Sequence, residues 1–240
     1  MRTPVVRFLA TCVCCAIAFP AAADLVTWQT TAAGITGNVT ASTNSGSGWS
    51  LDGTSGVAYD FGDLEPDLAS GSSVEFIFNY TDNRASIALG TVGGWSPGNE
   101  NNVFKLEQWN NTGKYGITIA GIVDYTLTTD STFSADTHVV FVRNGDGTMD
   151  MYLNGNSPER MVGKTNWRLD GGPGYIGSGA GGTGDLASGT AFAVASYSTA
   201  LTGTDVTNLY NAYVAVPEPA GVAVAATGLS FLVFLRRRLG

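Results

Sequence analysis

Residues 137–153, THVVFVRNGDGTMDMYL, predict a β-hairpin. The runs 137–143 and 148–153 are rich in the β-branched, aromatic and other apolar side chains that favour strands. Between them lies Asn144-Gly145-Asp146-Gly147, a glycine-rich segment of four residues that is typical of a hairpin loop. Asn154-Gly155 predicts a second tight turn directly after the hairpin.

Short runs of the same kind, separated by turn residues, continue through the rest of residues 24–213. Only residues 204–213 look helical, with Thr204 or Asp205 as the cap. Many short strands with almost no helix predict an all-β fold: a two-sheet antiparallel jelly-roll sandwich, with one short helix near the C-terminal end of the domain. The further expected strands are 74–80, 103–108, 115–119, 174–177 and 189–197, and the expected apolar face of the helix is Val206, Leu209 and Tyr210.

Residues 138–155 resemble the central hairpin of laminin-G-like, concanavalin-A-like jelly rolls, which read roughly Trp-His-His-Val-Ala-x-Val-Arg-Asp-Gly and then x-Tyr-Val-Asn-Gly. Three further segments resemble the family in the expected order, namely 73–80, 174–177 and 192–210. The resemblance covers residues 24–213 and implies the same jelly-roll fold. The chain departs from the pattern near Asp136, where the family usually has a tryptophan ahead of the hairpin.

Residues 1–23 have the features of a secretory signal peptide. A basic start with Arg2 and Arg7 precedes a largely apolar run, and Ala21-Ala22-Ala23 offers small residues for cleavage before Asp24. The alternative, a lipoprotein box ending at Cys12, has too short an apolar run before the cysteine. All three cysteines of the chain lie inside this segment, so we expect a mature protein without a disulfide, a thiol nucleophile or a Cys-ligated metal.

The C-terminal residues 214–240 have three parts in a fixed order. The linker 214–219 contains Pro217, Glu218 and Pro219, the apolar segment 220–235 follows, and the basic tail 236–240 closes the chain. A helix of the apolar segment is about 24 Å long. This is short against a hydrocarbon core of about 30 Å, but long basic side chains can reach the interface. The basic residues of the tail are Arg236, Arg237 and Arg238, which favour the cytoplasmic side.

This order of triplet, apolar segment and arginines resembles the PEP-CTERM sorting signal of Gram-negative bacteria. The resemblance implies transient anchoring in the inner membrane and cleavage near the triplet by an exosortase-type transpeptidase. It therefore predicts an exported protein that ends at the cell surface or in the extracellular matrix. A plain C-terminal membrane anchor that is never cut is the alternative.

The charge of residues 24–216 argues against nucleic acid as a partner. This segment has 7 basic and 19 acidic side chains, a net charge of −12, whereas phosphate binding requires clustered Lys and Arg.

The carboxylate motif of the glucanases that share this fold is missing from the sequence. Glucanases that share the jelly roll place alternate carboxylates on one strand, and no Glu-x-Asp-x-Glu triplet occurs here. The cluster Asp60, Asp63, Glu65 and Asp67 surrounds Gly62 and Pro66 and predicts a loop. His138, the only histidine, is expected to have a structural role. We expect a non-enzymatic protein, with a carbohydrate hydrolase as the alternative.

Binding of a polysaccharide, or of another extracellular partner, is the expected function. Trp95 and Trp109 lie among Gly and Asn residues and are the candidates to stack on sugar rings, although large aromatic residues also fill sandwich cores. Calcium binding is a second expectation. The candidate oxygen ligands belong to Asn144, Asp146 and Asp150, or to Asp52 and Asp60. Turn formation explains the same Asn and Asp residues without a metal. A structural matrix component without a specific ligand is the remaining alternative.

The sorting interpretation predicts the outcome of changing the triplet. Replacing Pro217, Glu218 and Pro219 with alanines should leave uncut, membrane-bound protein, because the processing element is lost while the apolar segment stays. Immunoblots of membrane, surface and medium fractions measure this. Unchanged release of the variant into the medium would contradict processing at the triplet.

Overall fold

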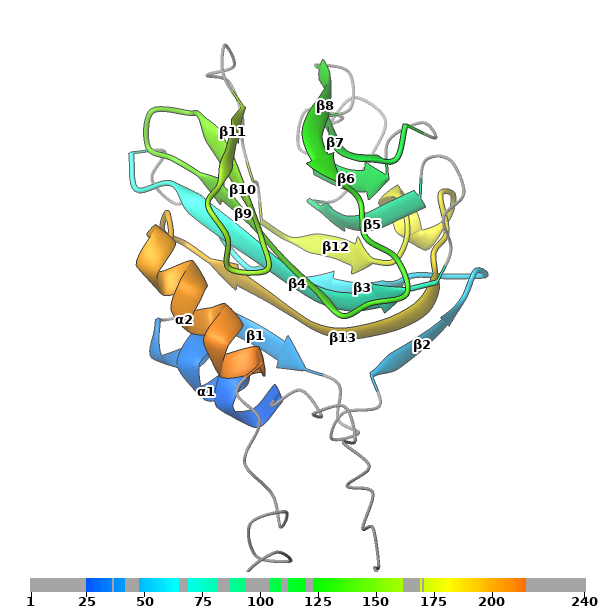
Figure 1. The fold of residues 1–240 in the computed structure, drawn as a ribbon, viewed down its shortest axis with the longest axis horizontal. Coiled ribbons are helices and arrows are strands. Elements are labelled where there is room, and N and C mark those ends of the chain that lie inside the picture. Colours follow the sequence, from blue (N-terminus) through cyan, green and yellow to red (C-terminus); the bar gives the residue numbers. More distant parts are fainter. Residues whose placement is uncertain are drawn as a thin grey trace, which may run out of the picture.

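The computed structural model describes residues 25–35, 37–41, 48–64, 69–81, 87–93, 104–108, 112–119, 123–161, 169 and 171–214. In this part of the chain two antiparallel sheets pack face to face, which confirms the predicted all-β jelly-roll sandwich (Figure 1). Sheet A contains, in spatial order, β1 (Asn38–Ala41), β13 (Ser188–Tyr197), β4 (Ser72–Tyr80), β9 (Thr137–Arg143), β10 (Met149–Leu153) and β11 (Glu159–Met161), and β2 (Trp49–Asp52) also pairs with β13.

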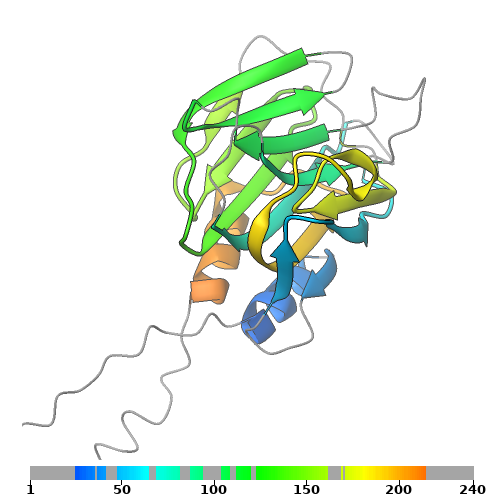
Figure 2. The same cartoon turned by 90° about the vertical axis from the view of Figure 1, so that its right-hand side faces the viewer.

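Sheet B forms the second layer, which Figure 2 shows from the side of its strands β6, β7 and β8. Its spatial order is β3 (Val57–Asp60), β12 (Pro173–Ile176), β5 (Ile87–Val92), β6 (Phe104–Gln108), β7 (Lys114–Ile119) and β8 (Val123–Asp130). Every pairing in both sheets is antiparallel.

The hairpin predicted over residues 137–153 is present as β9 and β10. Arg143 pairs with Met149, and the Asn144 amide donates to the Thr148 carbonyl at 2.8 Å. Gly147 has φ of 82°, which a side chain would strain. The second turn follows at Asn154 and Gly155, with φ of 51° and 69°.

The main core lies between the sheets and follows the alternation of the strands. On β4, Val74, Phe76, Phe78 and Tyr80 point to this core, and all four are fully buried. The intervening Ile77 belongs to a second apolar cluster on the outer face of sheet A. Because β4 is buried on both faces, something must cover the outside of sheet A.

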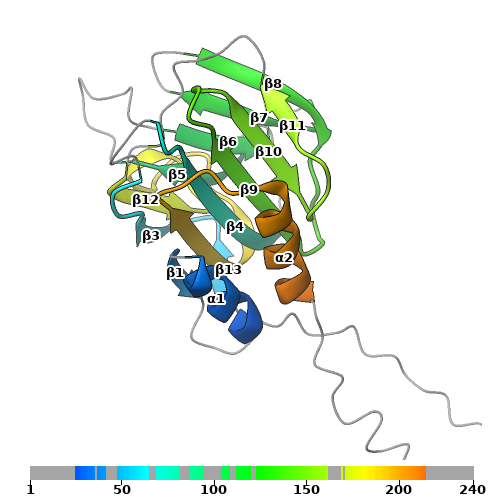
Figure 3. The same ribbon diagram turned by 90° about the vertical axis from the view of Figure 1, so that its left-hand side faces the viewer.

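Two helices provide that cover, α1 (Leu25–Gly34) and α2 (Gly203–Val214), which lie side by side on sheet A (Figure 3). Only the second was predicted from the sequence. The segment that forms α1, LVTWQTTAAG, has four β-branched residues and a final glycine, so its intrinsic preference for helix is weak. Its burial of Leu25, Trp28 and Ala32 shows that packing on the sheet stabilises it.

The cap of α2 lies two or three residues earlier than predicted. Thr202 precedes the helix, and its hydroxyl accepts a hydrogen bond from the Asp205 amide at 3.2 Å. The Asp205 carboxylate in turn accepts from the Thr202 amide at 2.9 Å, which completes a reciprocal capping box. Val206 and Leu209 are buried as expected, and Tyr210 is half-buried.

Glu75 is the centre of a buried polar network that joins α1 to sheet A. Its Oε1 accepts a hydrogen bond from Trp28 Nε1 at 2.5 Å and lies 2.6 Å from His138 Nε2. Its Oε2 accepts from the Tyr197 hydroxyl at 2.6 Å. Burial and the nearby carboxylate raise the pKa of Tyr197. His138 is therefore a fully buried part of the scaffold, the structural role expected for it.

Asp136, which stands where the family usually has a tryptophan, ties the end of α2 to the sheet. Its Oδ1 accepts from Asn79 Nδ2 and its Oδ2 from the Tyr213 hydroxyl, both at 2.9 Å. Burial, followed by the charge of Asp136, raises the pKa of Tyr213.

Glu159 closes the sandwich where the edge strands β8 and β11 meet. Its carboxylate accepts from the backbone amides of Thr128 and Thr129, at 2.6 and 2.9 Å, and from the Thr129 hydroxyl at 2.6 Å. Burial alone would raise the pKa of Glu159, but these hydrogen bonds outweigh it and hold the pKa below its ordinary value.

Within the described ranges, no helix has the length and apolar character needed to cross a membrane. The signal peptide 1–23 and residues 215–240 of the predicted segment 214–240 lie outside those ranges, so both remain predictions. Val214, expected to begin the linker, is the last residue of α2.

The Glu75 network predicts a large loss of stability when the carboxylate is removed. Glu75→Ala should lower the free energy of unfolding by about 3 kcal/mol or more, because the buried donors of Trp28 and Tyr197 lose their acceptor and His138 loses its partner. Tyr197→Phe, which removes one donor, should cost about 1 kcal/mol. Urea unfolding followed by tryptophan fluorescence measures both. The exposed Asp124→Ala is the control, and a Glu75→Ala loss no larger than that of the control would contradict the role of the network.

The depressed pKa of Glu159 predicts a pH-dependent contribution to stability. The folded state holds this proton less tightly than the unfolded state, so the contribution is full above pH 4.5 and is lost as pH falls below it. Glu159→Gln should therefore be less stable than the native chain at pH 7, by about 1 kcal/mol. The gap should be smaller at pH 3, which lies below the ordinary pKa of a glutamate. Urea unfolding at both pH values tests this, and an equal gap at both would contradict it.

Candidate functional site

A row of polar side chains crosses the outer face of sheet B. Strand register places Tyr175 beside Thr91, Thr91 beside Lys105, Lys105 beside Thr118, and Thr118 beside Asp124. Paired residues in a sheet point to the same face, and the intervening Leu106 and Ile117 point into the core. We call Tyr175, Thr91, Lys105, Thr118 and Asp124 the polar row. It runs over five strands, from β12 to β8.

Lys105 is the charged centre of the polar row and lies between two carboxylates. Its Nζ is 2.7 Å from Glu107 Oε2 and 2.9 Å from Asp185 Oδ2. Glu107 is the next outward-facing residue on β6, and its Oε1 accepts from the Thr118 hydroxyl at 2.9 Å. Oε2 makes no hydrogen bond of good geometry, so the ion pair is its stabilising contact.

Burial differs strongly among these three charges. Glu107 has 2% of its side chain exposed and Lys105 has 17%, whereas Asp185 has 42%. Burial raises the pKa of Glu107, and Lys105 and Thr118 offset this only in part. For Lys105, burial lowers the pKa, but the hydrogen bonds and the charges of Glu107 and Asp185 outweigh it and raise the pKa above its ordinary value. Lys105 therefore stays charged at neutral pH.

Asp185 reaches Lys105 from the glycine-rich segment that follows β12. This segment contains the short helix η2 (Ala180–Gly182), and the Gly179 amide donates to the Gly184 carbonyl at 3.0 Å. Asp185 has φ of 45°, an unusual value for a residue with a side chain. The Ala88 amide donates to its carbonyl at 2.8 Å and so fastens the segment to β5. The strained backbone holds the carboxylate at the polar row.

The hairpin residues considered for calcium are engaged with one another and with Arg160. Asp150 accepts from Arg160 Nε at 2.7 Å and Nη2 at 2.6 Å, and also from Asn144 Nδ2 at 3.0 Å. Asp146 Oδ1 accepts from the Thr148 amide and hydroxyl, at 2.9 and 2.6 Å. Those bonds lower the pKa of Asp146. All three residues therefore have the turn contacts that the sequence offered as the alternative to a metal.

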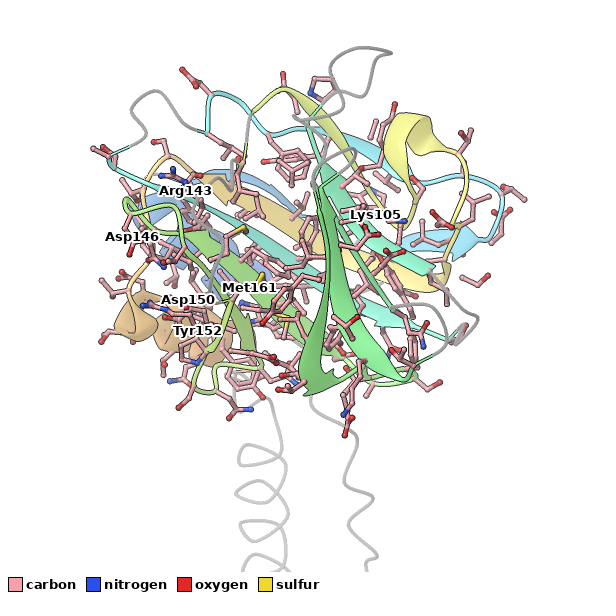
Figure 4. The ribbon with its side chains drawn as sticks, turned by 90° about the horizontal axis from the view of Figure 1, so that it is seen from above. Lys105, Arg143, Asp146, Asp150, Tyr152 and Met161 are labelled. Carbon is pink, nitrogen blue, oxygen red and sulfur yellow. The ribbon has the colours of Figure 1, made fainter. Side chains whose placement is uncertain are left out.

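Figure 4 shows Lys105 on one sheet, Asp146 and Asp150 on the other, and Met161 between them. The hairpin and the polar row are thus separate places on the molecule. Among the described residues no three His, Cys, Asp or Glu side chains are grouped so as to hold a metal ion. Calcium therefore stays a prediction.

The two other aspartates considered for calcium, Asp52 and Asp60, make local hydrogen bonds. Asp52 Oδ1 accepts from the amide and hydroxyl of Thr54, at 2.9 and 2.6 Å, and Asp60 Oδ1 accepts from the Gly62 amide at 2.9 Å, so both shape turns. Trp95 and Trp109 lie outside the described residues, as do Pro217, Glu218, Pro219 and the three C-terminal arginines.

Sequence reasoning did not find the polar row. The local signal was the alternation of Lys105, Leu106 and Glu107 within the expected strand 103–108, which places two opposite charges on one face. Thr118, Asp124 and Asp185 join them only through strand register and through the path of the segment after β12.

Comparison with known proteins defines the class of this chain. Residues 51–207 match the family described as the concanavalin A-like lectin/glucanases superfamily. The chain belongs to that superfamily, as the resemblance in its sequence implied. No curated protein matches the chain in sequence.

Solved structures share the fold at low sequence identity. A carbohydrate-binding module, CBM40 of the Ruminococcus gnavus IT-sialidase, was solved with α2,3 sialyllactose bound. It superposes with a TM-score of 0.52 at 16% identity, over 68% of this chain and 96% of that one. The same module with α2,6 sialyllactose bound superposes with a TM-score of 0.51 at 15% identity, over 72% of this chain and 97% of that one. At this identity the likeness establishes the fold alone.

Proposed function

We propose that this protein is an exported, non-enzymatic carbohydrate-binding protein and that the polar row on sheet B binds the glycan. The observation that carries the proposal is the row with its neighbours Glu107 and Asp185. Together they place the half-buried ring of Tyr175, the Thr118 hydroxyl, carboxylates and an ammonium group on one face, whereas Thr91 is fully buried and accepts from the Tyr175 amide. Sugars need such a set, because their hydroxyls both donate and accept hydrogen bonds while their CH groups pack on aromatic rings.

The position of the polar row supports this proposal. The outer face of sheet A is covered by α1 and α2, whereas neither α-helix lies on the outer face of sheet B (Figures 1 and 3). Trp95 lies in the sequence between β5 and β6, and Trp109 directly follows β6, the strand of Lys105 and Glu107. The two tryptophans considered for sugar stacking thus belong to chain segments attached to the central strands of the row.

A glycosidase is the alternative that Glu107 and Asp185 bring to mind, since two nearby carboxylates perform that reaction. The ammonium group of Lys105 contacts both of them and lies in the space that a scissile bond and the attacking group would need. This arrangement favours binding over hydrolysis.

The predicted sorting signal complements the binding function. We propose export through the signal peptide 1–23, transient anchoring in the inner membrane, and processing by an exosortase-type transpeptidase at Pro217, Glu218 and Pro219. The processed protein would act at the cell surface or in the extracellular matrix. A structural matrix component without a ligand shares this localisation, so glycan affinity separates the two.

Thermal unfolding of the purified protein against a panel of soluble polysaccharides tests the proposal. A ligand at a hundredfold excess over its dissociation constant stabilises a protein by about 2.7 kcal/mol. For a domain of this size that is a rise in melting temperature of about 5–10 °C. At least one polysaccharide should produce such a rise. A panel without any shift would contradict glycan binding and favour the structural matrix component.

Matched lysine variants test the location of the site. Lys105→Met should weaken binding about tenfold or more, while Lys114→Met, which breaks the comparable surface pair with Asp130, should bind as the native chain does. Asp124→Ala, at an exposed position of the row, provides a second variant if Lys105→Met is unstable. Equal binding by Lys105→Met, Asp124→Ala and Lys114→Met would place the site elsewhere.

A further inference from the structure

We propose that the polar row selects uncharged glycans and rejects sugars that carry carboxylate or sulfate groups. This inference rests on the proposed function and adds the chemical class of the ligand. It starts from the charges at the row, where Lys105 faces the carboxylates of Glu107 and Asp185, and Asp124 adds a third acidic group. The polar row together with Glu107 and Asp185 therefore has a net charge of −2.

A site that binds an acidic sugar needs a cationic side chain with N–H donors that are free to contact the sugar's carboxylate. Recognition of a carboxylate is strongest with a guanidinium or ammonium group that is not already neutralised. Lys105 donates one N–H to Asp185 and forms an ion pair with Glu107, so an N–H donor remains for a neutral oxygen acceptor of the ligand. A carboxylate that approached this donor would also approach three acidic side chains.

The other described cations offer no replacement at the row. Lys114 pairs with Asp130, and Arg160 makes a bidentate contact with Asp150 on the opposite sheet. Arg143 lies on sheet A with 5% of its surface exposed. Arg84, Lys164 and Arg168 lie outside the described residues. Within the described part of the chain, the charge near the row therefore remains negative.

Hydroxyl groups suit the same surface. The Thr118 hydroxyl donates to Glu107, which leaves its lone pairs free to accept from a sugar. Asp185 and Asp124 are exposed and present further carboxylate acceptors. A neutral sugar meets these acceptors with several O–H donors and presents a ring or hydroxyl oxygen to the remaining N–H of Lys105. The row thus attracts neutral sugars and repels anionic ones, which is how like charges create specificity.

Matched pairs of polysaccharides test the inference. Soluble (1→4)-β-glucan, galactan and mannan are each compared with the same polymer after its C6 alcohols have been oxidised to carboxylates. For any polymer that binds, the oxidised form should bind about tenfold or more weakly at low ionic strength. The difference should shrink in 0.5 M salt, because salt screens the repulsion. Isothermal titration or affinity electrophoresis gives the ratio.

Two double variants assign the repulsion to the polar row. Glu107→Gln with Asp185→Asn removes two negative charges beside Lys105 and should reduce the neutral-to-oxidised ratio to about threefold or less. Asp130→Asn with Asp146→Asn removes the same charge elsewhere and should keep the native ratio. Asp185→Asn alone, at an exposed position, serves if the first double variant is unstable.

The outcomes separate this inference from the function on which it rests. Binding of the oxidised polymers by the native protein as tightly as the neutral ones, or more tightly, would overturn the inference and leave glycan binding intact. If both double variants keep the native neutral-to-oxidised ratio, the charges at the polar row are not the cause of the discrimination. If none of the six polymers binds, and no polysaccharide of the thermal-unfolding panel raises the melting temperature, the proposed function is contradicted and this inference falls with it.

Discussion

The buried carboxylate of Glu75 is the contact on which the arrangement of this domain depends. It lies on β4, the central strand of sheet A, and accepts hydrogen bonds from the first helix and from β13 while contacting His138 on β9. A buried carboxylate is tolerated only where several partners satisfy it, so α1 can dock only where Trp28 reaches Glu75. Specific polar pairing thus positions a helix whose own sequence favours the helical state weakly.

The docked helices also determine which surface is left for a ligand. With α1 and α2 packed on sheet A, much of its outer face is buried in the second apolar cluster. Sheet B has the opposite arrangement. Along the polar row its outward residues are polar, and the buried carboxylate of Glu107 beside the row is held by Lys105 and Thr118 rather than by a helix. The two sheets therefore have separate roles, one as the scaffold and one as the candidate binding face.

Much of the fold could be predicted from the sequence because its signals are local. Asn144-Gly145-Asp146-Gly147 requires a tight loop whatever surrounds it, and β9 and β10 pair across it as expected. The helix α1 could not be predicted, because Trp28 is held by Glu75, 47 residues away. The polar row could not be predicted either, since Lys105, Thr118 and Asp124 become neighbours only when the register of three strands is known.

The position of the C-terminal helix connects the binding face to the predicted sorting tail. The helix α2 ends at Val214 on the outer side of sheet A, and Tyr213 near its end is fixed to Asp136. The polar row lies on the outer side of sheet B, across the full thickness of the sandwich. A chain that is anchored through residues after 214 is therefore held from the face opposite the row. Under the proposed sorting, the same domain can stay attached to a surface while its candidate glycan-binding face points away from that surface.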